Sequence, residues 1–486
     1  MLLWLVIAYI AVSVAIGLYA ATRVHNARDY IVAGRNLPFV FVLAMVFATW
    51  FGAETVLGIS ATFIDEGFRG LISDPLGASI CLVLFGLVFA RPLYRLNLLT
   101  LGDFFRMRYN RGTEVALSLA IIVSYLGWVG AQMAALGLVF NVLSDGAIAM
   151  NQGVFIGAAV VLVYTLFGGM WSVAMTTFVQ MIVIILGLLY VTWIAGDMAG
   201  GFDTVIGKAA AEGKFEFLPT MDMLDILAWT AALLTMALGS IPQQDVFQRV
   251  NASKNERVAM WGTTIGGISY FFFAAVPLFL AYSATLIDPA LVERFMDEDS
   301  QLILPNLIIG YMPFAAQVVF FGALISVIMS TASGTLLAPS VTFSENILRG
   351  YWTDMTDRQL LLSTRLAVVA FTLIVAVYAV STDATIHHMV ESAYRVTLAG
   401  AFVPLAAGLF WKRANNLGAT LAIVLGIGTW LFLELFVPEG DIEPQLYGLA
   451  VSALGMAIGG YLGPRSHHRP HAGHHHAAEA THHVAR

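Results

Sequence analysis

The chain has 486 residues, of which 59% are hydrophobic and 11% are charged. Soluble domains are nearer half apolar and a quarter charged, so this composition excludes a soluble fold and is typical of an all-α polytopic membrane protein. The net charge of −7 gives no basis for a nucleic-acid partner, and the single Cys81 excludes an intrachain disulfide.

Thirteen hydrophobic segments follow one another, each long enough to cross a bilayer at about 1.5 Å per residue. The predicted spans are residues 2–22, 39–63, 70–92, 113–144, 151–170, 172–197, 224–249, 257–287, 312–348, 359–382, 386–411, 417–437 and 444–463. Several exceed the bilayer thickness, so we expect tilted helices. The first span has no basic region before it and no clear cleavage site, and we expect it to be a retained helix.

Basic and acidic residues alternate between the loops of this arrangement. The loops expected on one side, with the C-terminal tail, hold 19 of the 24 Lys and Arg residues. The acidic loops, residues 197–222, 288–299 and 438–444, fall on the other side. The positive-inside rule then predicts a multi-pass protein of the cell (inner) membrane with its N-terminus outside and its C-terminus in the cytoplasm.

The second span carries the sequence FATWFGAE at residues 47–54. Gly52 disfavours a continuous helix, and Glu54 at mid-membrane is costly unless it faces water or a partner. A buried carboxyl in such a position indicates a functional site, and the alternative is an unbroken helix with a satisfied Glu.

The seventh span carries a second interruption, ALGSIPQQDVFQRV at residues 237–250. Pro242 removes a backbone donor and clashes with the preceding turn. Gln243, Gln244 and Asp245 follow at membrane depth and are candidate solute-binding residues. A simple proline kink is the alternative reading.

The two interrupted spans are five helices apart, which predicts two five-helix units of opposite topology. This organisation is typical of secondary transporters, in which unwound carbonyls coordinate a cation near the membrane midplane. The expected organisation is an extra helix and loop (1–38), a first repeat (39–197), an outer loop (198–223), a second repeat (224–411), two C-terminal helices (412–465) and a disordered His-rich tail (466–486).

The ninth span contains LISVIMSTASGTLLAPS at residues 324–340. Ser330, Thr331 and Ser333 offer hydroxyl oxygens, which together with carbonyls suit a hard cation such as Na⁺. Small residues of this kind also serve helix packing in membranes, and the spacing alone leaves both readings open.

These motifs together resemble those of the sodium:solute symporter family. The resemblance rests on YTLFGGMWSVAMTTFVQ (164–180), IPQQDVFQR (241–249), VIMSTASGTLL (327–337) and ARPLYRLNLLTLGDFFRMRY (90–109), and it covers the chain except its tail. It implies a leucine-transporter-type 5+5 inverted repeat with flanking helices and sodium as the coupling ion. We expect no enzymatic activity, because the sequence has no metal-ligand cluster in its core, no nucleophile elbow and no nucleotide loop.

The resemblance also implies a sodium site. Its carbonyl oxygens would come from Ala48, Phe51 and Val327, and its hydroxyl oxygens from Ser330 and Thr331. Some members bind a second sodium through an Asp and a Ser at positions held here by Thr177 and Gly334. Without that carboxylate a second cation gains little to offset its dehydration, so we expect one coupled sodium.

Within the family, the sequence is most similar to choline-transporter-like and proline-symporter-like members. Trp50 and Trp128 match two walls of an aromatic cage, in which Trp attracts cationic ligands. Interior packing is the alternative role for both. The third wall is Gln243 here, which favours a ligand with more hydrogen-bonding groups than choline.

Polar groups near the cage extend the predicted solute site. Glu54 and Asp245 favour a positive charge, although a protonated Glu54 could instead donate to a carboxylate. Gln132 lies one turn from Trp128 on the same helix face. We therefore expect a sodium-coupled symporter that imports an amine, an amino acid or a betaine-like zwitterion, as a monomeric transport unit in the lipid bilayer.

Two alternatives stay open from the sequence. One is a symporter for a small carboxylate. The other is a transporter-like sensor that acts through a separate signalling partner, in which case loss of the gene would abolish a response and leave uptake normal.

Overall fold

The computed structural model describes residues 1–437 and 442–464, and this part of the chain is helical throughout its regular elements. Nine of its helices are long and apolar enough to cross a membrane, and a bent pair can form a tenth span. The expected His-rich tail (466–486) and most of the acidic loop 438–444 lie outside the described residues.

The helices follow the predicted hydrophobic segments closely. In chain order the α-helices are α1 (Leu2–Ala20), α2 (Ala27–Val32), α3 (Phe39–Trp50), α4 (Ile59–Glu66), α5 (Ala78–Leu84), α6 (Ala90–Arg95), α7 (Leu101–Arg108), α8 (Arg111–Leu143), α9 (Met150–Met198), α10 (Phe202–Ala211), α11 (Met223–Ala237), α12 (Gln244–Asn251), α13 (Glu256–Phe273), α14 (Ala275–Ile287), α15 (Pro289–Glu298), α16 (Ile303–Tyr311), α17 (Phe314–Thr342), α18 (Arg349–Tyr351), α19 (Asp357–Ser381), α20 (Ile386–Ala393), α21 (Arg395–Gly400), α22 (Phe402–Phe410), α23 (Asn416–Phe436) and α24 (Pro444–Leu462). Short π-helical turns, η3 (Glu54–Gly58) and η5 (Ile72–Gly77), join α3 to α4 and precede α5.

Helix α9 contains the predicted fifth and sixth spans. The chain reverses at Gly169, whose φ of 49° is left-handed and suits glycine. Tyr164 and Ser172, on either side of this reversal, both lie against Gly17 of α1. The eleventh span is also bent, by 47° between α21 and α22, and this bend was not predicted.

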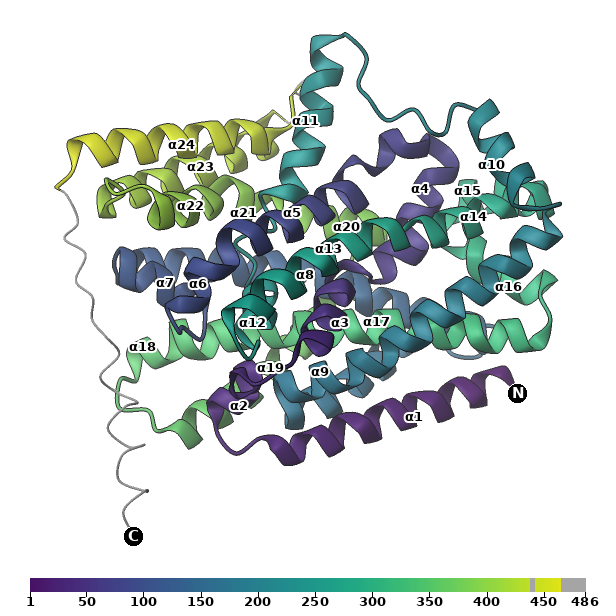
Figure 1. The fold of residues 1–486 in the computed structure, drawn as a ribbon, viewed down its shortest axis with the longest axis horizontal. Coiled ribbons are helices and arrows are strands. Elements are labelled where there is room, and N and C mark those ends of the chain that lie inside the picture. The colour runs from purple at the N-terminus through teal and green to yellow at the C-terminus, as the bar shows by residue number, and fades with distance from the viewer. Residues whose placement is uncertain (438–441, 465–486) are drawn as a thin grey trace.

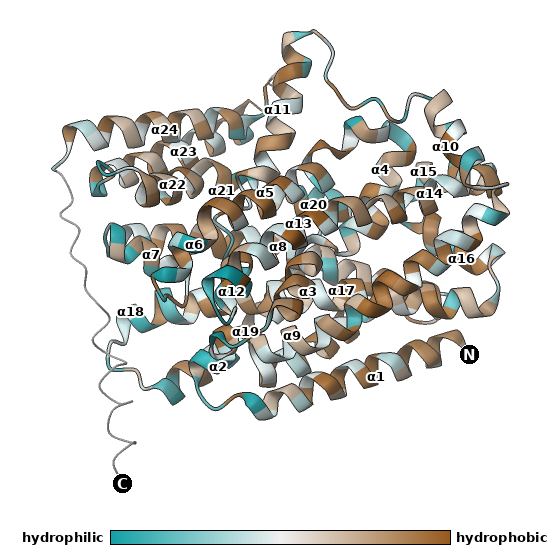
Figure 2. Ribbon diagram, in the orientation of Figure 1, coloured by the Kyte–Doolittle hydropathy of each residue, from teal (hydrophilic) through white to brown (hydrophobic). Residues whose placement is uncertain are grey.

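At each end of the bundle, hydrogen bonds or ion pairs join loops that are far apart in the sequence. At one end Leu37 N donates to Ala252 O at 3.0 Å, and Arg95 pairs with Glu256 at 2.7 Å. At the other end Phe68 N donates to Lys214 O at 2.8 Å. The N-terminus lies at the end with α10 and α16, and α24 ends on the side of α6 and α7 (Figure 1). Figure 2 shows hydrophilic residues gathered on α2, α7 and α18, at the end of the bundle where α6 and α7 lie.

Helix α17 forms the centre of the bundle. Every residue from Ala323 to Thr342 is buried, as expected for a helix that is apolar or small-residued on all sides. It packs against α1, α3, α8, α9, α12 and α19. The centre of the protein is therefore the place where α17 meets the end of α3.

Candidate functional site

The second span is broken where the sequence predicted. Helix α3 ends at Trp50, and Phe51 takes a non-helical ψ of 70° before helical turns resume at Glu54. The Trp50 carbonyl accepts from Gly52 N at 2.8 Å and from Thr55 Oγ1 at 2.7 Å. A Cβ on Gly52 would lie 2.2 Å from Glu54 Oε2, so only glycine fits this break as it is folded.

The seventh span is broken as well. Helix α11 ends at Ala237 and α12 begins at Gln244, with Pro242 in the irregular segment between them. Thr397 Oγ1 donates at 2.7 Å to Gly239 O, one of the carbonyls that the break frees. A side chain on α21 thus provides a hydrogen bond that the helix no longer supplies.

Two of the five residues predicted to hold sodium, Ala48 and Phe51, lie at the end of α3, and the other three lie on α17. Thr331 reaches across between the two helices. Thr331 Oγ1 lies 3.2 Å from Ala48 O and 3.4 Å from Phe51 O, across the break. Ser330 Oγ donates to Val327 O at 2.9 Å on the same helix. All five residues are fully buried, so these oxygens are the local polar groups available to a cation. Carbonyl and hydroxyl oxygens are the ligands that hard cations prefer.

A buried arginine lies beside the predicted sodium site. Arg249 of α12 is fully buried, and its Nη1 donates to the carbonyl of Met45. A Cβ built on Gly334 would lie 1.9 Å from Arg249 Nη2. The guanidinium therefore fills the space that a serine side chain would take at position 334. Thr177, at the position of the family's Asp, has a buried hydroxyl without a hydrogen-bond partner among the described residues.

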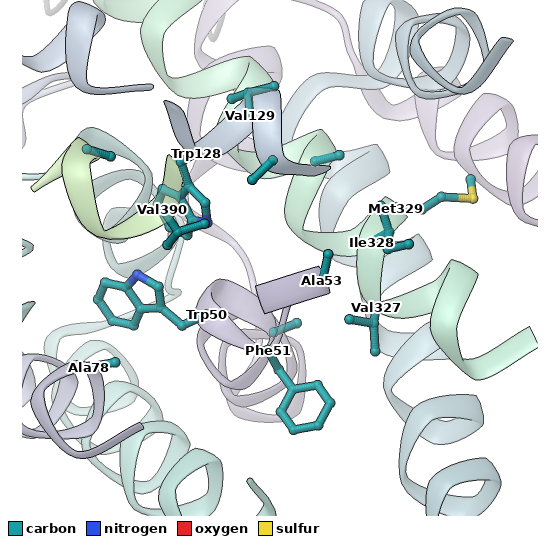
Figure 3. Close-up of a cluster of buried hydrophobic side chains, with 14 of the residues drawn as sticks. Trp50, Phe51, Ala53, Ala78, Trp128, Val129, Val327, Ile328, Met329 and Val390 are labelled. Carbon is teal, nitrogen blue, oxygen red and sulfur yellow. The ribbon is translucent and has the colours of Figure 1, made fainter. Parts of the chain in front are cut away.

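Aromatic rings cover the other side of the broken segment. The Trp50 and Trp128 rings are stacked with centroids 6.1 Å apart, and Trp50 Nε1 donates to Tyr394 OH at 2.9 Å. Trp128 also stacks on Tyr125 at 6.0 Å and meets Tyr394 edge-on at 5.6 Å. In Figure 3, Trp50 lies toward Trp128 and Val390, whereas Ala53 lies toward Val327 and Ile328. We call Trp50, Tyr125, Trp128 and Tyr394 the aromatic cluster.

Glu54 is held by residues of α8. Trp128 Nε1 donates to Glu54 Oε1 at 3.1 Å, and Gln132 Nε2 donates to Oε2 at 2.7 Å. Gln132 Oε1 in turn accepts from Ala53 N at 3.0 Å, so its amide ties the C-terminal end of the break to α8. The predicted residues Trp50, Glu54, Trp128 and Gln132 thus form one connected set.

The three polar residues of the seventh span have different surroundings. Asp245 Oδ1 accepts from Tyr125 OH at 2.7 Å and so joins the aromatic cluster. Gln243 bonds Ser124 at 3.1 Å and Thr397 at 3.5 Å, beside the cluster. Gln244 points elsewhere: its amide accepts from Leu101 N and donates to Leu99 O, at 2.9 and 3.3 Å. The structure therefore does not bring Gln244 to the predicted solute site.

The sodium:solute symporter family model matches residues 30–426 of the chain. The chain belongs to the sodium:solute symporter family. The coupling ion is sodium, and the protein is a multi-pass membrane transporter.

Known members of this family align over most of the symporter. It is 27% identical to the human high affinity choline transporter 1, over 91% of this chain and 77% of the relative. It is 26% identical to the high-affinity proline transporter PutP of Bacillus subtilis, over 91% of this chain and 94% of the relative.

A solved structure establishes the fold of the symporter. The Na⁺-coupled sialic acid symporter in its substrate-bound outward-open state superposes with a TM-score of 0.82 at 17% identity, covering 96% of this chain and 99% of that one. The fold is the leucine-transporter type, as the family resemblance implied.

Four buried residues of the symporter's site were not predicted. Tyr125 and Tyr394 complete the aromatic cluster, and Asp74 and Tyr270 form a hydrogen-bonded pair near Glu54. Asp74 is a carboxylate inside a predicted span and could have been found by the reasoning that singled out Glu54. The three tyrosines carry no such signal, because Tyr is common in membrane proteins.

Proposed function

We propose that this symporter imports a small organic solute with a positively charged group, namely an amine, an amino acid or a betaine-like zwitterion. The observation that carries the proposal is that residues 48–54 contact both groups of residues predicted to bind ligands. Ala48 and Phe51 present carbonyls to Thr331, and Trp50 and Glu54 join the aromatic cluster and α8.

The shared segment supplies a mechanism for coupling. Sodium bound to the carbonyls would order the break, and an ordered break places Trp50 and Glu54 for the solute. Each ligand then raises the affinity for the other by the same factor. Sodium entry, aided by about 2.3 kcal/mol per charge per 100 mV of membrane potential, drives solute uptake by alternating access.

We expect the N-terminus of the symporter to lie outside the cell. The loops rich in Lys and Arg share the end of the bundle formed by α6, α7 and α18, which we assign to the cytoplasm. Reaction of a cysteine inserted directly after Met1 with a membrane-impermeant maleimide in intact cells checks this assignment, and protection from it contradicts the assignment.

We expect one sodium per solute in each cycle. The guanidinium of Arg249 against Gly334 is a fixed positive charge next to the hydroxyls of α17, so a second cation there would be repelled. Thr177 adds no negative charge to offset that repulsion. Parallel sodium and solute fluxes in proteoliposomes should give a ratio near one, and a ratio near two would contradict the expectation.

A thermal-shift screen tests the proposed function. Small amines, amino acids, betaines and carboxylates are added with sodium or with N-methyl-D-glucamine as the only cation. We expect ligands with a positive group to raise the melting temperature only in sodium, and Trp50→Ala to abolish that increase. Stabilisation by carboxylates alone, or by no class of solute, would overturn the proposal. Trp193→Ala, on an exposed part of α9, is the control and should keep the response.

A further inference from the structure

A small cavity lies beside the aromatic cluster, on the side away from α17. Side chains from η3, η5, α11 and α20 line it, among them Glu54, Ser73, Asp74, Thr235, His387 and Glu391. Val390 lines it too and lies next to Trp128 in Figure 3. The space open to the centre of a water molecule is about 10 Å³, which admits one group of the size of water.

Asp74 carries an oxygen in the cavity lining that lacks a hydrogen-bond partner among the described residues. Its side chain is 3% exposed, its Oδ1 accepts from Tyr270 OH, and its Oδ2 has no hydrogen-bond partner among the described residues. Tyr270 OH lies 3.3 Å from Thr55 Oγ1, which donates to the Trp50 carbonyl. Asp74 is thus connected to the same break that separates the sodium and aromatic sides.

The charges around the cavity are unbalanced. Glu54, Asp74 and Glu391 line it, and neither Lys nor Arg is among its lining residues. Two neighbouring carboxyls in a dry site cannot both ionise without a cation between them. His387 is the one basic side chain of the lining. The acidic lining of the cavity therefore suits a positively charged group that belongs to the solute.

The part of the chain that the structure describes contains no group of three or more His, Cys, Asp or Glu side chains arranged to hold a metal ion. A buried carboxylate oxygen without a partner is instead well matched by an N–H donor, and charge-assisted hydrogen bonds of this kind are short and strong. An –NH₃⁺ group is about the size of a water molecule, whereas a trimethylammonium group is much larger and has no N–H.

We propose that Asp74 and Glu54 bind the N–H groups of a protonated primary or secondary amine, so that the solute is an amine and not a quaternary ammonium. The inference rests on the proposed function and narrows its solute class. The ammonium group of the solute occupies the small cavity and donates to Asp74 Oδ2 and to Glu54, whose Oε1 also accepts from Trp128. Asp74 and Tyr270 become solute-positioning residues of the symporter.

Matched pairs of compounds that differ only in N-methylation test the inference. Ethanolamine is compared with choline, and glycine with betaine, by sodium-dependent thermal shift of the full-length protein. We expect the member with N–H groups to bind roughly tenfold or more tightly, because the methylated one leaves the Asp74 oxygen unsatisfied. Equal or tighter binding of the methylated member overturns the inference and leaves the proposed function standing. If neither these four compounds nor any other amine raises the melting temperature in sodium, both the inference and the proposed function are wrong.

Two variants assign the preference to residues. Asp74→Asn should remove most of the preference for the N–H member, whereas Glu293→Gln, an exposed acid of α15 outside the cavity lining, should keep it. A sodium affinity that falls in Asp74→Asn without any amine present would show that the pair binds the coupling ion and would also overturn the inference. Melting temperatures without ligand verify that each variant is folded, and the wild-type comparison decides the matter if Asp74→Asn does not fold.

Discussion

Replacement of Thr331 by valine is expected to lower the apparent sodium affinity by about 5- to 150-fold and to abolish sodium-driven accumulation. Valine keeps the shape of threonine but removes the hydroxyl that reaches Ala48 O and Phe51 O across the break. Loss of one buried polar partner costs about 1–3 kcal/mol, and each 1.4 kcal/mol is a factor of ten. Sodium titrations of solute uptake in proteoliposomes measure this change.

The chain offers a matched control on the same helix. Thr335 is also fully buried, but its hydroxyl donates only to Thr331 O and Ala332 O, at 2.8 and 3.3 Å, within α17. Thr335→Val should therefore leave the sodium affinity within about twofold of wild type, as expected when a hydroxyl that bonds only its own helix is lost. Equal effects of the two substitutions would show that Thr331 acts through general packing and not through the cation site.

Replacement of Gly127 by alanine is expected to destabilise the protein by about 1–3 kcal/mol and to weaken solute binding strongly. A Cβ on Gly127 would lie 2.4 Å from the backbone carbonyl of Met389, which cannot rotate away as a side chain could. Helix α20 must then move from α8 and carry Tyr394 with it. Tyr394 accepts the Trp50 Nε1 hydrogen bond and meets Trp128 edge-on, so the aromatic cluster would open. Melting temperature and sodium-dependent ligand shifts measure both effects.

Gly322→Ala on α17 is the control for this second substitution. Its added Cβ would meet nothing within 4 Å, and alanine favours a helix by about 1 kcal/mol over glycine. The control should be neutral or slightly stabilising, opposite in sign to Gly127→Ala. A Gly127→Ala protein with wild-type stability and solute response would contradict the close approach of α8 and α20.

The features that were predictable from the sequence have local causes. Pro242 removes a backbone donor and Gly52 weakens a helix wherever they occur, and both breaks lie where these residues stand. The positions of Ala48, Phe51 and Thr331 followed from the family resemblance, and the structure brings them into contact.

What could not be predicted depends on contacts between distant segments. Tyr394 lies 344 residues from its partner Trp50, and Tyr270 lies 196 residues from Asp74, so no local pattern links them. Gln244 was misplaced for the same reason. It follows Gln243 in the sequence, but one step along the start of α12 turns its amide toward Leu99, just before α7, and Leu101, the first residue of α7.

The most direct test of the account is a pair of cryo-EM maps, one recorded in sodium and one in N-methyl-D-glucamine. We expect the sodium map alone to show density for an ion bonded to the carbonyl oxygens of Ala48 and Phe51 and to the hydroxyl of Thr331, with the helix interrupted at residues 51–53. A continuous helix through those residues, or no difference between the maps at this position, would contradict the account.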